Sequence, residues 1–270
     1  MIQRKLYAVK SDKLKPFILN YSLVSFELLL QSEEVEMKVP PLGFPVLIFY
    51  FGNITNFYKH KELTCQSVFV GQMDKHIMLY PSSKAKLLGV NFRPYGLYNL
   101  FGISPSFILN SGFESSLFFG EQEVNTITDK LKSVADPEEV LPDIEDLLLR
   151  FQQIYVRKQP FFDEMVDKIL LEKGLIDPFS FLGKSSVRTF QRYFKQVVGI
   201  MPKTYCQLLR HKYILEQMYL NPDILKSELV LKGFYHDYSH FRKDFVRFSE
   251  TPPIRYLDLK NNFASTLLTK

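Results

Sequence analysis

With 270 residues, 46% of them hydrophobic and 15% aromatic, the chain is long enough for two hydrophobic cores, because single domains commonly hold about 100–150 residues. Its two cysteines exclude a disulfide framework and a cysteine-rich zinc site. The first fifteen residues lack the apolar stretch of a signal peptide, and no segment approaches the roughly 20 apolar residues of a membrane-spanning helix. We therefore expect a cytoplasmic protein without membrane association.

The net charge of +5 is distributed unevenly along the chain. Residues 181–260 contain fourteen Lys and Arg against seven Asp and Glu, whereas residues 1–180 contain nineteen against twenty-two. A basic C-terminal part is expected of a module that contacts nucleic-acid phosphates. A solvated basic surface would give the same count, so charge alone leaves nucleic-acid binding open.

From about Lys5 to Arg93 the pattern predicts β-strands, in apolar segments at residues 39–53, 66–72 and 84–96 that turn residues separate. The segment Phe44–Phe51 is apolar throughout, which is typical of a strand covered on both faces.

From about Glu121 apolar residues recur three and four apart, which predicts amphipathic helices at residues 121–134 and 137–156. Charge and a proline interrupt this period at residues 157–160, where we place a linker.

Residues 177–205 have the pattern of a helix-turn-helix unit. Asp177 followed by proline predicts the start of a short helix, and the Gly-Lys pair at residues 183–184 predicts its end. Ser185 or Ser186 can then cap a second helix. In residues 229–256, Asp237 can cap a similar helix.

The two second helices share one arrangement of side chains. Apolar residues at spacings of four and three predict their buried faces, which are Phe190, Phe194 and Val197 in one and Phe241, Phe245 and Phe248 in the other. Long polar side chains then lie outward, where arginine and glutamine can reach base edges in a major groove. Residues 202–220 form a helical spacer that, at about 1.5 Å per residue, spans nearly 30 Å, close to one turn of DNA.

The segments RTFQRYFKQVVGIMPKTY (188–205) and SHFRKDFVRFSETPPIRY (239–256) resemble the two signature motifs of the AraC/XylS family of transcription regulators. The matching positions are Arg188, Phe190, Arg192, Phe194, Gly199, Pro202 and Tyr205, then Phe241, Phe245, Phe248, Pro253 and Tyr256. The resemblance covers about residues 160–258 and implies two helix-turn-helix units that bind adjacent major grooves. The implied DNA-binding residues are Ser186, Arg188, Thr189, Gln191, Arg192, Lys195, Tyr238, Ser239, Arg242 and Lys243.

The second unit departs from the family pattern more than the first. Val230 stands where a small alanine is usual, and Phe234 and Glu250 stand where glycines are usual. Gly233 lies one residue early, and a local shift could use it for the turn. We therefore expect the first unit to supply most of the DNA specificity.

A looser resemblance connects the segments LGFPVLIFYFG, FVGQ and GVNFRPYGLYNLFG to the sensor-like N-terminal domain of some family members. The fold class expected is α+β: a β-rich, barrel-like domain ending in helices over residues 1–157, then an all-α double helix-turn-helix domain over residues 158–262. Duplex DNA is the main expected partner. RNA polymerase, a small-molecule effector and a second copy of the chain are further candidates, and the sequence identifies no effector-binding residue.

Other features have less specific interpretations. His236 and His240 lack a third metal ligand nearby, so we expect no metal and no cofactor. Cys206 is expected to be a packed thiol. The turn at residues 93–96 either holds an anionic effector or simply ends a strand. The aromatic residues Phe49, Tyr50, Phe51, Phe57 and Tyr58 either line a pocket or belong to the core.

Two functions remain open from the sequence. The first is sequence-specific regulation of transcription. The alternative is a ligand-binding or protein-interaction module whose helix-turn-helix domain has lost productive docking on DNA. An enzyme is not expected, because no nucleophile–base pair, phosphate loop or metal set is present in the sequence.

Overall fold

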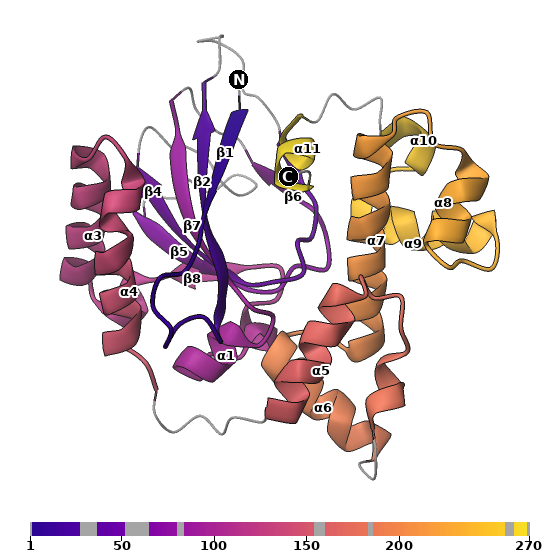
Figure 1. The fold of residues 1–270 in the computed structure, drawn as a ribbon, viewed down its shortest axis with the longest axis horizontal. Helices are drawn as coiled ribbons and strands as arrows, with labels where there is room; N and C mark the ends of the chain where they lie inside the picture. The colour runs from indigo at the N-terminus through magenta and orange to yellow at the C-terminus, as the bar shows by residue number, and fades with distance from the viewer. Residues whose placement is uncertain are drawn as a thin grey trace.

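The computed structural model describes residues 2–27, 37–51, 65–79, 84–153, 160–182, 186–256 and 262–268. An antiparallel β-sheet part is followed by a helical part (Figure 1). This agrees with the expected α+β class at the level of its two parts. No helix in the described ranges combines the length and the apolar character needed to cross a membrane.

The main sheet has the strand order β1-β2-β7-β4-β5-β8, and β3 pairs with β6 in a separate two-stranded sheet. The strands are β1 (Ile2–Tyr7), β2 (Ile18–Phe26), β3 (Met37–Val39), β4 (Val46–Phe51), β5 (Ser67–Val70), β6 (Ile77–Leu79), β7 (Lys86–Phe92) and β8 (Gly112–Glu114). In the described part of the chain these strands form a six-stranded sheet and a separate two-stranded pair, and β3 and β6 hydrogen-bond to each other and to no strand of the main sheet.

The strand register separates the two faces of the main sheet. Tyr21 pairs with Val90, Val90 with Leu47, and Leu47 with Phe69, so one row of large apolar side chains crosses four strands. This row is buried beneath the helices α3 (Glu121–Ser133) and α4 (Leu141–Arg150), which cover that face (Figure 1). The other face turns toward the β3–β6 pair.

The strand expected to be covered on both faces is β4. Leu47 and Phe49 face the α3 and α4 side, whereas Ile48 and Tyr50 face the β3–β6 side. The prediction for this segment is confirmed. The turn residues at 52–53 and 81–83 lie outside the described residues.

The two predicted helices of the first part are present, with one difference in length. α3 fills its predicted range, and α4 follows a short 3-10 helix, η2 (Pro137–Val140). α4 ends at Arg150 instead of continuing to residue 156. Its buried Glu145 accepts hydrogen bonds from the Tyr21 hydroxyl at 3.1 Å and from the backbone N–H of Lys10 at 2.9 Å, which satisfies the carboxylate.

The helical part begins at Pro160; the linker expected at residues 157–160 otherwise falls on positions outside the described residues. Its elements are α5 (Pro160–Leu171), η3 (Pro178–Phe181), α6 (Val187–Val198), α7 (Pro202–Leu220), α8 (Lys226–Lys232), α9 (Tyr238–Ser249), α10 (Pro253–Tyr256) and α11 (Asn262–Leu268). Figure 1 shows α5 and α6 at one end of the long α7, with α8, α9 and α10 toward the other. The last helix, α11, returns to lie against β1 and β3 as well as α7.

Two short helical elements after β7, α1 (Gly96–Phe101) and η1 (Pro105–Ile108), contact α6. A third, α2 (Ser116–Phe119), follows β8 and contacts α3. Arg93 donates to both carboxylate oxygens of Asp167 on α5 at 3.1 Å, and the Tyr95 hydroxyl donates to the same carboxylate at 2.9 Å. The turn at residues 93–96 therefore holds an internal carboxylate, so the anionic-effector interpretation of Arg93 is replaced by a contact between the two parts.

Replacing Asp167 with alanine should lower the free energy of unfolding by about 1–3 kcal/mol, because two side chains lose a charged hydrogen-bond partner in a half-buried contact. Urea unfolding of the full chain measures this. Asp146→Ala, an exposed carboxylate on α4 for which no side-chain partner is found among the described residues, is the matched control. Equal losses in the two variants would contradict the role given to this contact.

Candidate nucleic-acid interface and ligand cavity

The first helix-turn-helix unit consists of η3 and α6. Asp177 caps η3 by accepting from the backbone N–H of Phe179 at 3.0 Å, as expected, although the element is a single 3-10 turn. Of the two serines proposed as caps for the second helix, Ser186 is the cap, since its hydroxyl accepts from the Thr189 N–H at 3.2 Å. Gly199 ends α6 in the left-handed region, with φ of 100°.

The predicted outward face of α6 is largely exposed. Arg188, Arg192 and Lys195 are exposed, and no ion pair or side-chain hydrogen bond to another described residue is found for them. Gln191 is partly buried and therefore less available than predicted. The opposite face carries Phe194, which is fully buried. The helix thus presents long cationic side chains from a fixed backbone.

Two further predicted contact residues of α6 have a structural role as well. The Ser186 hydroxyl donates to the Thr189 hydroxyl oxygen at 2.9 Å, so both side chains belong to the helix cap. They are nevertheless exposed at the first turn of the helix. The N–H groups of a helix N-terminus and its capping hydroxyls are groups that can contact a DNA phosphate.

The second unit, α8 and α9, has the same construction. The Asp237 carboxylate caps α9 by accepting from the His240 N–H at 2.8 Å. Ser239, Arg242 and Lys243 are exposed. Tyr238 is only half exposed, and its ring lies 5.6 Å from that of Phe241, so this residue packs on the unit's core instead of pointing fully outward.

The turn of the second unit is formed differently from the sequence-based expectation. Gly233 has φ of −84°, so it does not supply the left-handed residue. Phe234 does so, with φ of 52°, and its side chain is 71% exposed. Gly233 is needed for a different reason: a Cβ at this position would lie 2.5 Å from the Tyr235 ring. The proposed shift to Gly233 is therefore wrong, and the strain falls on Phe234.

The end of α9 repeats the same feature. Glu250 caps this helix in the left-handed region, with φ of 50°, at the position that Gly199 occupies after α6. A non-glycine residue in this conformation costs on the order of 1–3 kcal/mol. The two departures at glycine positions, Phe234 and Glu250, thus coincide with backbone strain in the second unit.

α7 joins the two units over 19 residues. Its two ends lie in different hydrophobic clusters, one with α5 and α6 and the other with α8 and α9. The thiol of Cys206 on α7 is buried, and burial raises the pKa of this thiol to about 12. Cys206 is therefore a packed and unreactive group.

His211 on α7 is a buried polar group that sequence analysis did not single out. Its ring stacks on Phe248 at 5.3 Å and meets Phe245 edge to face at 4.9 Å, which joins α7 to α9. Neither ring nitrogen has a hydrogen-bond partner among the described residues. Burial, and secondarily the Lys38 ammonium, lowers the pKa of His211 to about 3.

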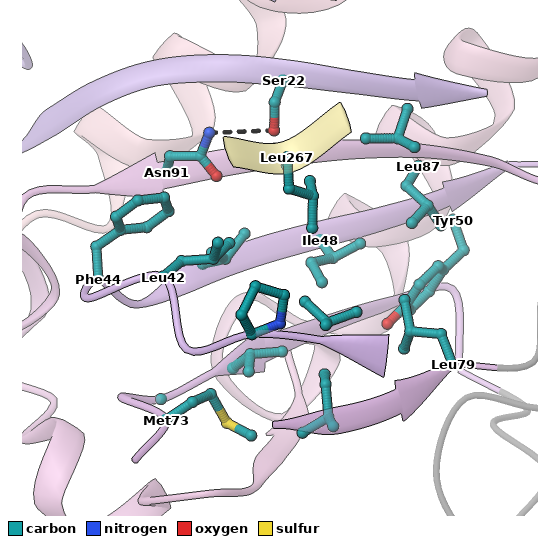
Figure 2. Close-up of a pocket in the computed structure, with 18 residues that line it drawn as sticks. Ser22, Leu42, Phe44, Ile48, Tyr50, Met73, Leu79, Leu87, Asn91 and Leu267 are labelled. Carbon is teal, nitrogen blue, oxygen red and sulfur yellow. Dashed lines mark hydrogen bonds between the residues drawn. The ribbon is translucent and has the colours of Figure 1, made fainter. Parts of the chain in front are cut away.

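A cavity of about 110 Å³ lies between the main sheet and the β3–β6 pair (Figure 2). Its walls come from β2, β4, β5 and β7 on one side and from β3 and β6 on the other. The segments that join β3 to β4 and β5 to β6 complete the lining, together with Leu267 of α11. Gly89 on β7 leaves space in the cavity wall, since a Cβ on this residue would lie 2.9 Å from the Ser22 hydroxyl oxygen. The Asn91 amide donates to that hydroxyl at 3.1 Å, which gives the cavity one polar end (Figure 2).

The remaining lining is apolar except for the hydroxyl of Tyr50, one of the aromatic residues considered for a pocket. Phe49 and Phe51 belong to the core, and Phe57 and Tyr58 lie outside the described residues. Sequence analysis missed the rest of the lining, because it comes from six strands, two connecting segments and α11, none of which carries a local signal for a pocket. The small Gly89 within an apolar strand was the only hint.

Comparison with known proteins gives a partial match. Residues 11–114, less than half of the chain, match a family model described as a domain of unknown function, DUF6597. No curated protein matches the sequence.

Among solved structures the chain is similar to ToxT from Vibrio cholerae O395, at 8% identity and a TM-score of 0.46, over 94% of this chain and 99% of that one. It is also similar to unsaturated fatty acid-bound ToxT from strain SCE256, at 10% identity and a TM-score of 0.46, over 92% and 97% of the two chains. Likeness this distant does not carry function from ToxT to this chain.

Replacing Phe234 with glycine should raise the free energy of unfolding by about 0.5–1 kcal/mol, because relief of left-handed strain exceeds the entropy that glycine loses on folding. Urea unfolding gives the value. Phe234→Ala is the control, since it removes the exposed ring but keeps Cβ at positive φ. If both variants gain equally, the ring and not the backbone is responsible.

Stability should fall with acidification through His211. In the unfolded chain a histidine has a pKa of about 6.5, whereas in the folded chain His211 stays neutral down to a much lower pH. Below pH 6.5 protons therefore bind the unfolded chain but not the folded one, and the free energy of unfolding falls. Between pH 7 and pH 5 we expect the wild type to lose about 2 kcal/mol relative to His211→Leu, at a slope near 1.4 kcal/mol per pH unit. Urea unfolding of both proteins at the two pH values measures this, and a pH-independent difference would contradict it.

Proposed function

We propose that the chain is a sequence-specific DNA-binding transcription regulator of the AraC type. The observation that carries this proposal is the pair of capped helices α6 and α9, each of 12 residues, with exposed cations opposite a phenylalanine-rich buried face. The signature motifs fall in register on these two helices. In this function phosphate contacts position the protein while the two helices read bases in adjacent major grooves.

The spacing of the helices supports this use. A helix of 19 residues at about 1.5 Å per residue places its two ends nearly 30 Å apart, close to one turn of DNA. The C-terminal part is also the basic part of the chain, so long-range attraction would favour its approach to DNA. The affinity would then fall steeply with salt concentration.

The cavity supports a second element of the proposal, which is regulation by a small apolar effector. Its lining is apolar except for the Ser22–Asn91 pair and the Tyr50 hydroxyl, and such sites take ligands by burial with few orienting hydrogen bonds. We further propose a cytoplasmic regulator without catalytic activity or cofactor, with RNA polymerase and a second copy of the chain as partners.

The alternative function is a ligand-binding or interaction module that no longer docks on DNA. The left-handed Phe234 and Glu250 favour it for the second unit only, because both lie at the ends of that unit's helices. The first unit has glycine at its helix end and an unstrained cap. DNA binding through the first unit therefore distinguishes the two functions.

The decisive variant is Arg188→Ala with Arg192→Ala. Sites are first selected from a random duplex library with the wild-type chain, and affinities are then measured by mobility shift at two salt concentrations. The double variant should lose about 2–6 kcal/mol of specific binding, on a scale of about 1–3 kcal/mol for each bidentate contact. The control, Arg150→Ala with Lys132→Ala, removes two cations from α4 and α3 and should bind nearly as the wild type does.

An unchanged footprint of the double variant, or the absence of any selected site, would favour the alternative. Single variants test the ranking of the two units: Arg188→Ala should weaken binding more than Arg242→Ala does. The reverse order would show that the second unit dominates in spite of its strained turn.

A further inference from the structure

The C-terminal helix α11 contributes two adjacent leucines to two different hydrophobic cores. Leu267 packs with the cluster around the cavity and lines the cavity itself. Figure 2 shows its side chain pointing from α11 into the space between the main sheet and the β3–β6 pair. Leu268, 7% exposed, belongs to the cluster that α7 shares with α8 and α9, and α11 reaches this cluster on its α7 side.

These two leucines are joined by one planar peptide, so their side chains cannot move independently by more than the neighbouring dihedral angles allow. A molecule that displaces α11 to take the place of Leu267 would therefore also draw Leu268 away from the α7 side of this cluster, on which α8 and α9 pack.

The size of the cavity indicates which ligands would have to displace Leu267. With Leu267 in place the cavity is about 110 Å³, and an engineered apolar cavity of about 150 Å³ holds one benzene ring. A ligand much larger than one ring needs the space that Leu267 fills.

The stability of α11 also suits displacement. α11 has only seven residues, and helices this short are not stable alone, so its position depends on its contacts. One of these is the hydrogen bond from the Arg4 Nη1 to the Leu267 carbonyl at 2.7 Å.

We propose that α11 is an internal occupant of the cavity, and that an apolar ligand larger than a single ring binds by displacing it and loosens the second helix-turn-helix unit. This rests on the proposed role of the cavity as an effector site. Because coupling is reciprocal, any partner that holds the second unit rigid also weakens binding of the ligand. The free chain is then the form in which α8 and α9 are held in place.

The test uses the full chain and the apolar fluorophore N-phenyl-1-naphthylamine, which has two separate aromatic groups. Its binding is followed by fluorescence, and backbone hydrogen exchange is measured with and without saturating probe. The probe should speed exchange in α11 and α9 and leave α3 unchanged. Bound probe with unchanged or slower exchange in α9 would overturn the proposal.

Two leucine variants separate displacement from simple filling of space. Leu267→Ala should bind the probe about tenfold more tightly, because the probe no longer competes with a buried leucine side chain. Leu268→Ala should speed exchange in α9 without any probe. Leu231→Ala, the same change at a side chain 73% exposed on α8, should alter neither reading.

If neither the wild type nor Leu267→Ala binds the probe, the proposal is overturned. Normal exchange in α9 of Leu268→Ala would overturn it as well. Neither result bears on DNA binding, which is measured without ligand on the selected duplex sites. Failure of this inference and failure of the proposed regulator function are therefore distinguishable.

Discussion

The contact between the β3–β4 segment and α7 determines where both candidate sites lie. The fully buried Tyr205 hydroxyl donates to the Gly43 carbonyl at 3.1 Å, and a Cβ on Gly43 would lie 2.8 Å from a Leu209 methyl group. Backbone and helix therefore approach closely only because residue 43 is glycine, with φ of 85°. On either side of it, Leu42 and Phe44 line the cavity. One segment thus faces the apolar cavity and the spacer helix together.

The two helix-turn-helix units are held on the sheet part in different ways. The first has charged and polar contacts through α5 and the end of α6, including the Ser104 hydroxyl, which donates to the Gln196 carbonyl at 2.5 Å. The second is connected through α7 and α11, with additional contacts such as Lys38 to the Thr251 hydroxyl at 2.9 Å. The first unit is thus anchored to the sheet part by charged and polar groups, whereas the attachment of the second includes a seven-residue helix.

Strain in the second unit is consistent with this difference. Phe234 and Glu250 occupy conformations that glycine adopts without cost, one before α9 and one after it. Packing of Phe241, Phe245 and Phe248 against α7 supplies the stabilisation that holds them there. A unit built in this way has less stability in reserve than the first, and its order depends more on its neighbours.

The sequence by itself determined those features that depend on local patterns. Spacings of four and three located the buried faces of α6 and α9, although Phe190 is only partly buried. Asp237 located the start of α9 and the pair Ser185 or Ser186 that of α6, because caps are encoded within a few residues. It also located β4 and the coverage of this strand on both faces, since an unbroken apolar run is typical of a strand that is buried on both sides.

Only the tertiary structure decided the remaining features, which depend on residues far apart in the chain. The cavity requires strands paired in a particular register, the partner of Arg93 is 74 positions away, and the Arg4–Leu267 bond joins residues 263 positions apart. Phe234 and not Gly233 supplies the left-handed turn, and the Tyr235 ring leaves no room for a side chain at position 233. Periodicity identifies which face of an element is apolar, but only packing determines what that face meets.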